Sequence, residues 1–279
     1  MNLFLFSIGI NTAYFLADLF IKLGSYNYTA GRLVFYRSIL TVAMCFLWLI
    51  FSGQASNPPA FKEIAQLIGC GILCVIGLYF YVKALQGLHF VNVSVVGISG
   101  ALIHYLLGVF LNHESFNNWF YVAAILCLLG ISIQWRKQTL HKGLIDACLS
   151  ALFWGFGYAL LNIPLQNSNA IWGSFILEIC ALILSGFYIL RFEPKKKISE
   201  NNLKDYRLIL VALFTVLGSV WINYAYQKFN LSALGFMQLA FFPYSMLAGY
   251  FLFKERLSKI EWIGNSLVFL GLIIYYLFI

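Results

Sequence analysis

The sequence predicts an all-α membrane protein in which ten transmembrane helices form two inverted five-helix repeats. Of its 279 residues, 62% are hydrophobic and 10% are charged, whereas soluble domains average about 25% charged residues. The apolar residues lie in runs of about 20, the length that a helix needs to cross a bilayer core of ~30 Å. Positions 141 residues apart match along the chain, which indicates two copies of one unit. The composition excludes a soluble enzyme, a disordered chain and a collagen-like chain.

The apolar runs are the expected spans. Only helices and closed barrels satisfy their backbone hydrogen bonds in lipid, and barrel strands would alternate over about 10 residues. These runs are longer and apolar on all sides, so they predict helices. The first run has neither a basic n-region nor an A-x-A cleavage pattern, so we expect a membrane helix and not a signal peptide. The ten expected spans are residues 2–21, 30–51, 63–85, 91–111, 117–135, 143–162, 171–191, 206–226, 232–253 and 260–278.

The two expected repeats are residues 1–138 and 139–279. A unit with an odd number of spans must enter the membrane in the opposite direction in its second copy. Inverted repeats around a midplane site are typical of secondary transporters, because the pseudo-symmetry gives inward-open and outward-open states from one fold. The matches that keep the 141-residue offset include Ala84 with Ala225, Gly108 with Gly249, Glu114 with Glu255, and Gly130 with Gly271.

The basic residues predict the orientation. By loop parity, 14 of the 18 Lys and Arg residues lie on one side of the membrane, two on the other and two within spans. The positive-inside rule places the larger group in the cytoplasm, so both termini are expected outside. The net charge of +8 therefore belongs to loops beside anionic lipid, and nucleic acid is not an expected partner. The six cysteines lie in apolar runs, where they are expected to be small buried hydrophobic residues.

Short motifs in both halves carry a resemblance to a known family. They are Phe35-Tyr36-Arg37, Tyr79-x-Tyr81, Lys83-Ala84-Leu85 and Glu114, then Trp154-Gly155, Pro243 and Lys254-Glu255-Arg256-Leu257 before Gly264 and Gly271. Over nearly its whole length the chain resembles the EamA-like branch of the drug/metabolite transporter superfamily. The resemblance implies a central cavity lined by the first, third, fourth, sixth, eighth and ninth spans, with the fifth and tenth peripheral. It also implies small metabolites such as amino acids and amines as substrates, driven by proton or substrate exchange.

Three features depart from the pattern of that family. Lys83 stands where the family usually has a tyrosine or another neutral residue. The fourth span lacks the proline that Pro243 supplies in the ninth. The ten-span members are usually drawn with both termini in the cytoplasm, opposite to the charge count, and we follow the charge count because its bias is lopsided.

Ionisable residues inside spans are the first candidates for a site, since burying one in a bilayer costs about 2.5–3.5 kcal/mol or more. Arg37 and Glu178 lie near the middle of the second and seventh spans, and the 141-residue offset maps one onto the other. Glu178 is a candidate site for a substrate amine or a coupling proton, with Arg37 tuning it. In the alternative interpretation the two charges are neutralised by each other or by polar neighbours and lock the bundle.

A second candidate cluster lies in the first span. Asn11, Tyr14 and Asp18 are spaced by three and four residues, which places them on one helix face. Asp18 and Lys22 are also four residues apart, and the first expectation for them is an ion pair at the membrane interface. The alternative is that Asp18, with Asn11 and Tyr14, forms a polar face toward a cavity.

The remaining candidates are single residues in several spans. Lys83 is expected either to bind an anionic group or to extend to the interface, and His104 to shuttle protons or to pack in the core. Glu114 and Glu255 are expected to have a structural role, bonding to helix ends or to interfacial partners, and not to contact substrate. Deep aromatic rings could enclose a cationic or amphipathic solute, with a neutral polar side chain to orient it. This group consists of Tyr79, Trp154, Tyr158, Trp221, Tyr224, Gln238 and Tyr244.

The expected function is secondary active transport of a small organic solute, such as an amino acid or amine, by alternating access. A lipid-carrier or lipid-linked sugar translocase is the alternative. A scaffold is disfavoured, because it gains nothing from polar residues deep in the membrane. No nucleophile constellation, Walker, H-E-x-x-H or G-x-G-x-x-G pattern is present, so no enzymatic activity, cofactor or metal is expected. The expected partners are the substrate, membrane lipids and a coupling proton, for a monomer or homodimer in the bacterial inner (plasma) membrane.

Overall fold

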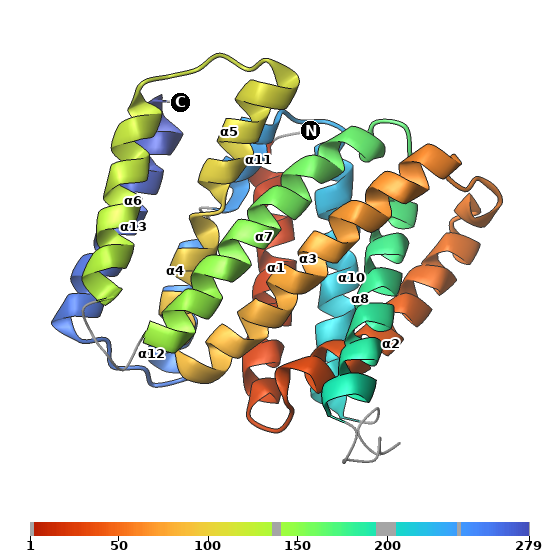
Figure 1. Cartoon of the computed structure of the whole chain (residues 1–279), viewed down its shortest axis with the longest axis horizontal. Helices are drawn as coiled ribbons and strands as arrows, with labels where there is room; N and C mark the ends of the chain where they lie inside the picture. The colour runs from red at the N-terminus through yellow and green to blue at the C-terminus, as the bar shows by residue number, and fades with distance from the viewer. Residues whose placement is uncertain (1–2, 136–140, 194–204, 239–240, 279) are drawn as a thin grey trace.

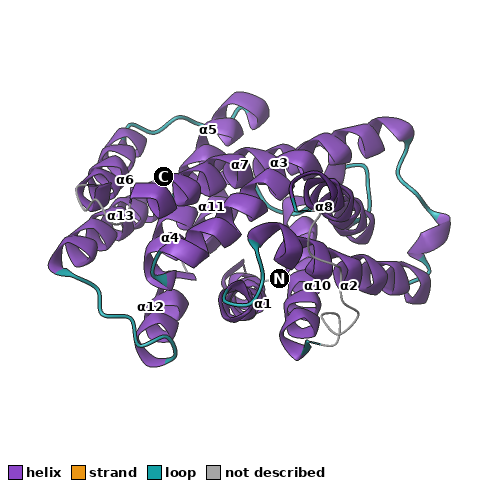
Figure 2. Ribbon diagram, turned by 60° about the horizontal axis from the view of Figure 1, so that its bottom comes forward, coloured by secondary structure: helices purple, strands orange, loops and turns teal. Residues whose placement is uncertain are grey.

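Helices form all of the secondary structure in the part of the chain that the structure describes (Figures 1 and 2). The computed structural model describes residues 3–135, 141–193, 205–238 and 241–278. Seven helical stretches are long and apolar enough to cross a membrane. The helices are α1 (Leu3–Ser25), α2 (Ala30–Phe51), the 3-10 helix η1 (Gln54–Ser56), α3 (Phe61–Gly87), α4 (Phe90–Ile98), α5 (Ala101–Asn112), α6 (Trp119–Trp135), α7 (His141–Leu165), α8 (Ala170–Phe192), α10 (Tyr206–Tyr226), α11 (Leu231–Met237), α12 (Phe241–Phe251) and α13 (Lys259–Phe278).

The expected span over residues 91–111 is not one unbroken helix. Between α4 and α5 the backbone N–H of Ser99 bonds to the carbonyl of Val96 (3.1 Å), and that of Leu102 bonds to Ser99 (3.1 Å). These i→i+3 bonds tighten the helix and break its regular ladder. Gly100 lets the break lie close to α7, because a Cβ there would be 3.0 Å from the carbonyl oxygen of Ala151. In the ninth expected span the structure describes α11 and α12, and residues 239–240 between them lie outside the described residues.

The helix packing follows the internal repeat. A shift of about 140 residues relates α1 to α7, α2 to α8, α3 to α10, α4 to α11, α5 to α12 and α6 to α13. α3 packs along α7, and its counterpart α10 packs along α1. In the same way α4 contacts α12 while α11 contacts α5, and α2 and α6 each pack on their own counterparts. Exchanging the two halves therefore leaves this contact pattern unchanged.

The apolar core lies between the halves. Its main cluster joins α2, α3, α4 and α7, where Leu33, Leu85, Phe90 and Leu144 are fully buried. At one flank α6 and α13 pack on each other, at the left of Figure 1. Glycine permits this close approach, since a Cβ on Gly130 would lie 2.5 Å from the carbonyl oxygen of Gly264.

Two glutamates join the halves at helix ends. After α5, Glu114 accepts hydrogen bonds from the first two backbone N–H groups of α11, at 3.0 Å from Leu231 and 3.3 Å from the next residue. After α12, Glu255 accepts from the first two N–H groups of α4, at 2.6 Å from Phe90 and 3.4 Å from the next residue. Carboxylates stabilise helix N-termini, whose N–H groups have no partner within the helix. This geometry agrees with the helix-end role expected for both residues.

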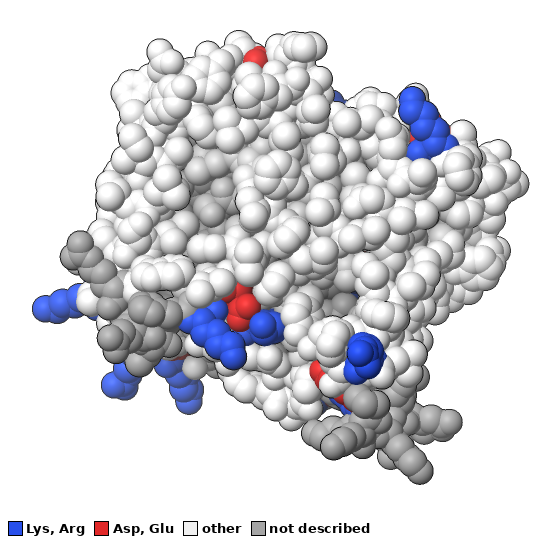
Figure 3. All heavy atoms as spheres, viewed as in Figure 1, with Lys and Arg blue, Asp and Glu red and all other residues white. Residues whose placement is uncertain are grey.

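Charged side chains gather at one edge of the molecule. In Figure 3 most Lys and Arg atoms lie along the lower edge, a few charged atoms lie at the upper edge, and a broad band between them carries none. The marked chain ends lie toward the upper edge of Figure 1. Six basic residues of the orientation argument lie outside the described residues, namely Arg136, Lys137, Lys195, Lys196, Lys197 and Lys204.

Candidate functional site

A cavity of about 190 Å³ lies between the two halves of the molecule. Its wall takes residues from α1 to α5 of the first half and from α7, α8, α10 and the α11–α12 region of the second. Neither α6 nor α13 contributes a lining residue among those that the structure describes. Nine residues of the predicted site line the cavity, namely Asn11, Tyr14, Asp18, Arg37, His104, Trp154, Tyr158, Glu178 and Gln238.

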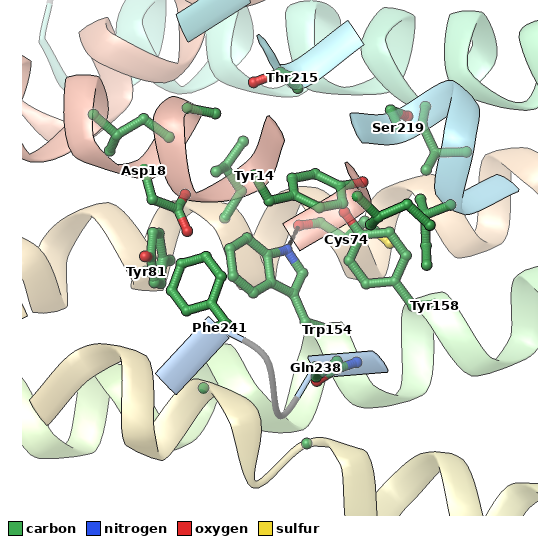
Figure 4. A pocket seen from close by; sticks show the side chains of 18 of the residues that line it. Tyr14, Asp18, Cys74, Tyr81, Trp154, Tyr158, Thr215, Ser219, Gln238 and Phe241 are labelled. Carbon is green, nitrogen blue, oxygen red and sulfur yellow. Dashed lines mark hydrogen bonds between the residues drawn. The ribbon is translucent and has the colours of Figure 1, made fainter. Parts of the chain in front are cut away.

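Aromatic rings form much of the wall (Figure 4). The rings of Tyr81 and Trp154 lie 4.8 Å apart between centroids. The indole N–H of Trp154 donates a hydrogen bond to the backbone oxygen of Cys74 at 3.0 Å. Gly77 makes room for this ring, because a Cβ there would lie 2.6 Å from Trp154 Cδ1. Trp154 is thus held in place by a backbone bond and by a close helix contact.

Arg37 and Glu178 form a buried ion pair. Arg37 Nη2 lies 2.5 Å from Glu178 Oε2, and the two side chains are 5% and 7% exposed. The hydroxyl of Thr41 donates to the same carboxylate oxygen at 2.7 Å, and Arg37 Nη1 donates to the hydroxyl of Thr215 at 3.4 Å. The contact joins two residues that the 141-residue offset relates, so the pair lies where the two halves meet.

Asp18 lines the cavity without an ion-pair partner among the described residues. Lys22, one turn away, does not contact it. The Nζ of Lys22 instead donates to the backbone oxygens of Leu85 (2.5 Å) and Leu88 (2.9 Å) at the end of α3. The first expectation, an interfacial Asp18–Lys22 pair, is therefore wrong, and the Asp18 carboxylate faces the hydroxyl of Tyr81 in the cavity wall.

His104 is held from two sides in α5. Its Nδ1 lies 3.2 Å from the backbone oxygen of Gly100, and its Nε2 lies 2.8 Å from the hydroxyl of Tyr226. A carbonyl oxygen only accepts, so Nδ1 carries the proton, and in the neutral imidazole Nε2 accepts from the tyrosine hydroxyl. This tautomer is the neutral imidazole, and it links α5 to α10.

Five residues of the predicted site lie outside this cavity. Lys83 pairs with Asp146 at 3.3 Å. The hydroxyl of Tyr79 bonds to that of Tyr188 at 2.9 Å. Tyr244 bonds through its hydroxyl to Thr12 in α1 at 3.3 Å. The other two are Trp221 and Tyr224 of α10, which are each 40% exposed and lie beside Phe6 of α1.

Comparison with known proteins decides the family. Residues 3–135 and 141–277 match the model of the EamA-like transporter family. The chain belongs to this family. UDP-galactose transporter homolog 1 of Schizosaccharomyces pombe is 25% identical over 259 residues, which are 85% of this chain and 79% of that protein. A crystal structure at 16% identity superposes with a TM-score of 0.70 and covers 99% of this chain and 97% of its own.

This EamA-family protein is a multi-pass membrane transporter. Its cavity is lined by the spans that the resemblance implies and by two further spans. The first, third, fourth, sixth, eighth and ninth expected spans all contribute, and the fifth and tenth do not. The second and seventh expected spans also contribute, through Arg37 and Glu178. Within the described residues, no group of three or more His, Cys, Asp and Glu side chains could hold a metal ion.

Sequence analysis missed several residues of the wall. Tyr81 lines the cavity while Tyr79 does not, because residues two apart point to nearly opposite sides of a helix. The spacing of polar residues in α10 carried a usable signal. Thr215, Ser219 and Tyr226 share one face through steps of four and seven residues, and that face lines the cavity. The missed polar and aromatic residues are Tyr81, Ser94, Thr215, Ser219, Tyr226 and Phe241.

Proposed function

We propose that the protein is a secondary active transporter that moves a small organic solute by alternating access through the central cavity. The observation that carries the proposal is a cavity whose wall is formed by both halves of the molecule. The pattern of contacts between helices stays the same when the two halves are exchanged. Two pseudo-symmetric halves of this kind can adopt two related conformations of similar stability, one open to each side of the membrane. The solute would bind both states with similar affinity and lower the barrier between them.

The proposal includes ten spans in two inverted repeats. The apolar α6, the α11–α12 pair and α13 would add three spans to the seven long apolar stretches. α1 begins at the upper edge of Figure 1 and its counterpart α7 begins at the lower edge, which supports the inversion. The proposal also places the protein in a bacterial plasma membrane, and the basic side chains at the lower edge support an orientation with that edge in the cytoplasm.

The cavity size favours a small solute. Its volume of about 190 Å³ is below the range of about 300–1,000 Å³ that is usual for pockets of drug-sized ligands. An amino acid or amine is closer to this size than a nucleotide sugar.

A nucleotide-sugar or lipid-linked sugar translocase is the second candidate. The similarity to UDP-galactose transporter homolog 1 favours it. A diphosphate needs cationic partners, and Arg37 in the cavity wall is already paired with Glu178. Lys83 is paired with Asp146 outside the cavity. These two contacts favour the small solute.

The test is counterflow into liposomes that hold the purified full-length protein. The liposomes are loaded with one unlabelled compound and given the labelled form outside, for a panel of amino acids, amines, nucleosides, UDP-galactose and prenyl phosphates. Exchange of a small solute that protein-free liposomes lack supports the proposal. Exchange of UDP-galactose or prenyl phosphate alone would move the assignment to the second candidate, and no exchange of any compound contradicts secondary transport of these classes.

Proton coupling through Glu178 is tested in the same liposomes. The ion pair must open for Glu178 to take up a proton, because its carboxylate bonds to both Arg37 and Thr41. With Glu178→Gln, we expect exchange to lose its dependence on pH while the protein still folds. A pH dependence equal to that of the wild type would remove Glu178 from coupling.

A further inference from the structure

We propose that the cavity takes a small monocationic amine and that the Asp18 carboxylate is its counter-ion. The inference rests on the proposed transport function and names the substrate class of the same cavity. It depends on the charges of the wall, on its aromatic rings and on its size.

When Asp18 is ionised, the charges of the wall sum to one negative charge. Among the described residues that line the cavity, the ionisable Asp, Glu, Arg and His side chains are Asp18, Arg37, His104 and Glu178. Arg37 and Glu178 cancel each other in an ion pair of 2.5 Å. His104 is counted as the neutral imidazole, in which Nδ1–H donates to the Gly100 carbonyl and Nε2 accepts from a tyrosine hydroxyl. Asp18 is left as the uncompensated charge.

Asp18 stays available because Lys22 is engaged elsewhere. Lys22 is 5% exposed and its Nζ bonds to the carbonyl oxygens of Leu85 and Leu88. The end of a helix exposes carbonyl groups that a lysine satisfies well. A charged group away from water is stable only when it is paired, so a cationic solute would complete the site at Asp18.

The wall around Asp18 suits an organic cation. Figure 4 shows the rings of Tyr81 and Phe241 close to the Asp18 side chain, with Trp154 and Tyr14 further along the cavity. The faces of aromatic rings attract cations, and they also pack against the apolar part of an amine. Anions find no such match, because the arginine of the wall is already paired.

The volume limits the size of the amine. A dry cavity of about 150 Å³ is large enough to bind benzene. The cavity here has about 190 Å³, which fits one ring with a short amine chain. The probe of choice is therefore 2-phenylethylamine. Three matched compounds change its charge or size: 2-phenylethanol removes the cation, phenylalanine adds a carboxylate, and UDP-galactose is a large anion.

The experiment measures the affinity of the four compounds for the detergent-purified full chain by calorimetry at pH 7. We expect 2-phenylethylamine to bind at least about tenfold more tightly than 2-phenylethanol, because a hydrogen bond to a charged group contributes an affinity difference of this size. Asp18→Asn should remove this preference and Asp18→Glu should retain it. Asp205→Asn, at the start of α10 and outside the cavity, is the matched control and should bind as the wild type does.

The outcomes separate this inference from the proposed function. Equal affinity for the amine and the alcohol, or an Asp18→Asn protein that keeps its preference, overturns the role of Asp18. Binding of phenylalanine or UDP-galactose in preference to the amine also overturns it. If those compounds then exchange in counterflow, the transport function stands without the amine. If the amine binds and no compound exchanges, the site stands and the transport function fails.

Discussion

The ion pair of Arg37 and Glu178 is the residue-scale feature that ties the two halves together. Removing one partner of a buried pair leaves an uncompensated charge, whereas removing both leaves none. We expect Arg37→Met or Glu178→Met alone to lower the free energy of unfolding by about 3–5 kcal/mol. The double variant should lose much less than the sum of the two. Denaturant unfolding in detergent measures all four proteins, and additive losses would contradict a direct coupling.

A second residue-scale prediction concerns pH at the start of α10. Hydrogen bonds from Arg207 hold the pKa of the Asp205 carboxyl below its ordinary value. A lowered pKa in the folded state means that the unfolded chain binds the proton more readily. The stabilising contribution is thus complete above the ordinary aspartate pKa of about 4 and is lost as the pH falls below it.

The measurement is the unfolding temperature in detergent between pH 7 and pH 3. The wild type should lose more stability over this interval than Asp205→Asn, whose amide cannot titrate but still caps the helix. Equal losses in the two proteins would show that Asp205 contributes nothing to the acid sensitivity.

At the scale of the helices, a glutamate of each half caps the start of a helix in the other half. Each cap satisfies two N–H groups at the start of a short helix of the other half. The residue before each glutamate, His113 or Lys254, has a positive φ of 54° or 52° and turns the chain back over the helix end. Gly108 and Gly249 leave room for the carboxylates, since a Cβ would lie 2.8 Å and 3.0 Å from their oxygens.

Alanine substitution tests both caps. We expect Glu114→Ala and Glu255→Ala each to lower the free energy of unfolding by about 1–2 kcal/mol, as the loss of an N-cap does. The caps lie at opposite edges of Figure 1, so the losses should add in the double variant. Glu63→Ala is the control, because one of its carboxylate oxygens has no hydrogen-bond partner among the described residues. A loss at Glu63 as large as at the two caps would contradict the assignment.

The break between α4 and α5 shows what sequence reasoning could not supply at this scale. The run 91–111 is apolar almost throughout, and a hydropathy pattern is the same for one long helix and for two short ones. Ser99 and Gly100 were weak signals of the break. The close approach of α7 and the cap from Glu255 act on α4 only in the folded protein.

At the scale of the whole molecule, the charged edge predicts the orientation in the membrane. Lys62, in the first turn of α3, and Arg256, between α12 and α13, are both exposed. The start of α3 and the segment between α12 and α13 lie at opposite edges of Figure 1. With the basic edge in the cytoplasm, Lys62→Cys should react with an impermeant maleimide in intact cells, and Arg256→Cys only after the cells are opened. The described cysteines are buried or half-buried, so we expect the maleimide not to label the wild-type protein. The reverse labelling pattern would place both termini in the cytoplasm.

The sequence by itself determined that the protein is a helical membrane protein, and the 141-residue offset related Arg37 to Glu178. These follow from composition, run length and spacing, which are properties of the chain before it folds, and short motifs added the resemblance to the family. The tertiary structure decided which partner each side chain takes. Lys22 bonds to the end of α3 and not to Asp18, and Tyr81 faces the cavity while Tyr79 bonds to Tyr188. Such choices depend on neighbours more than 60 positions away in the chain, so no local pattern encodes them.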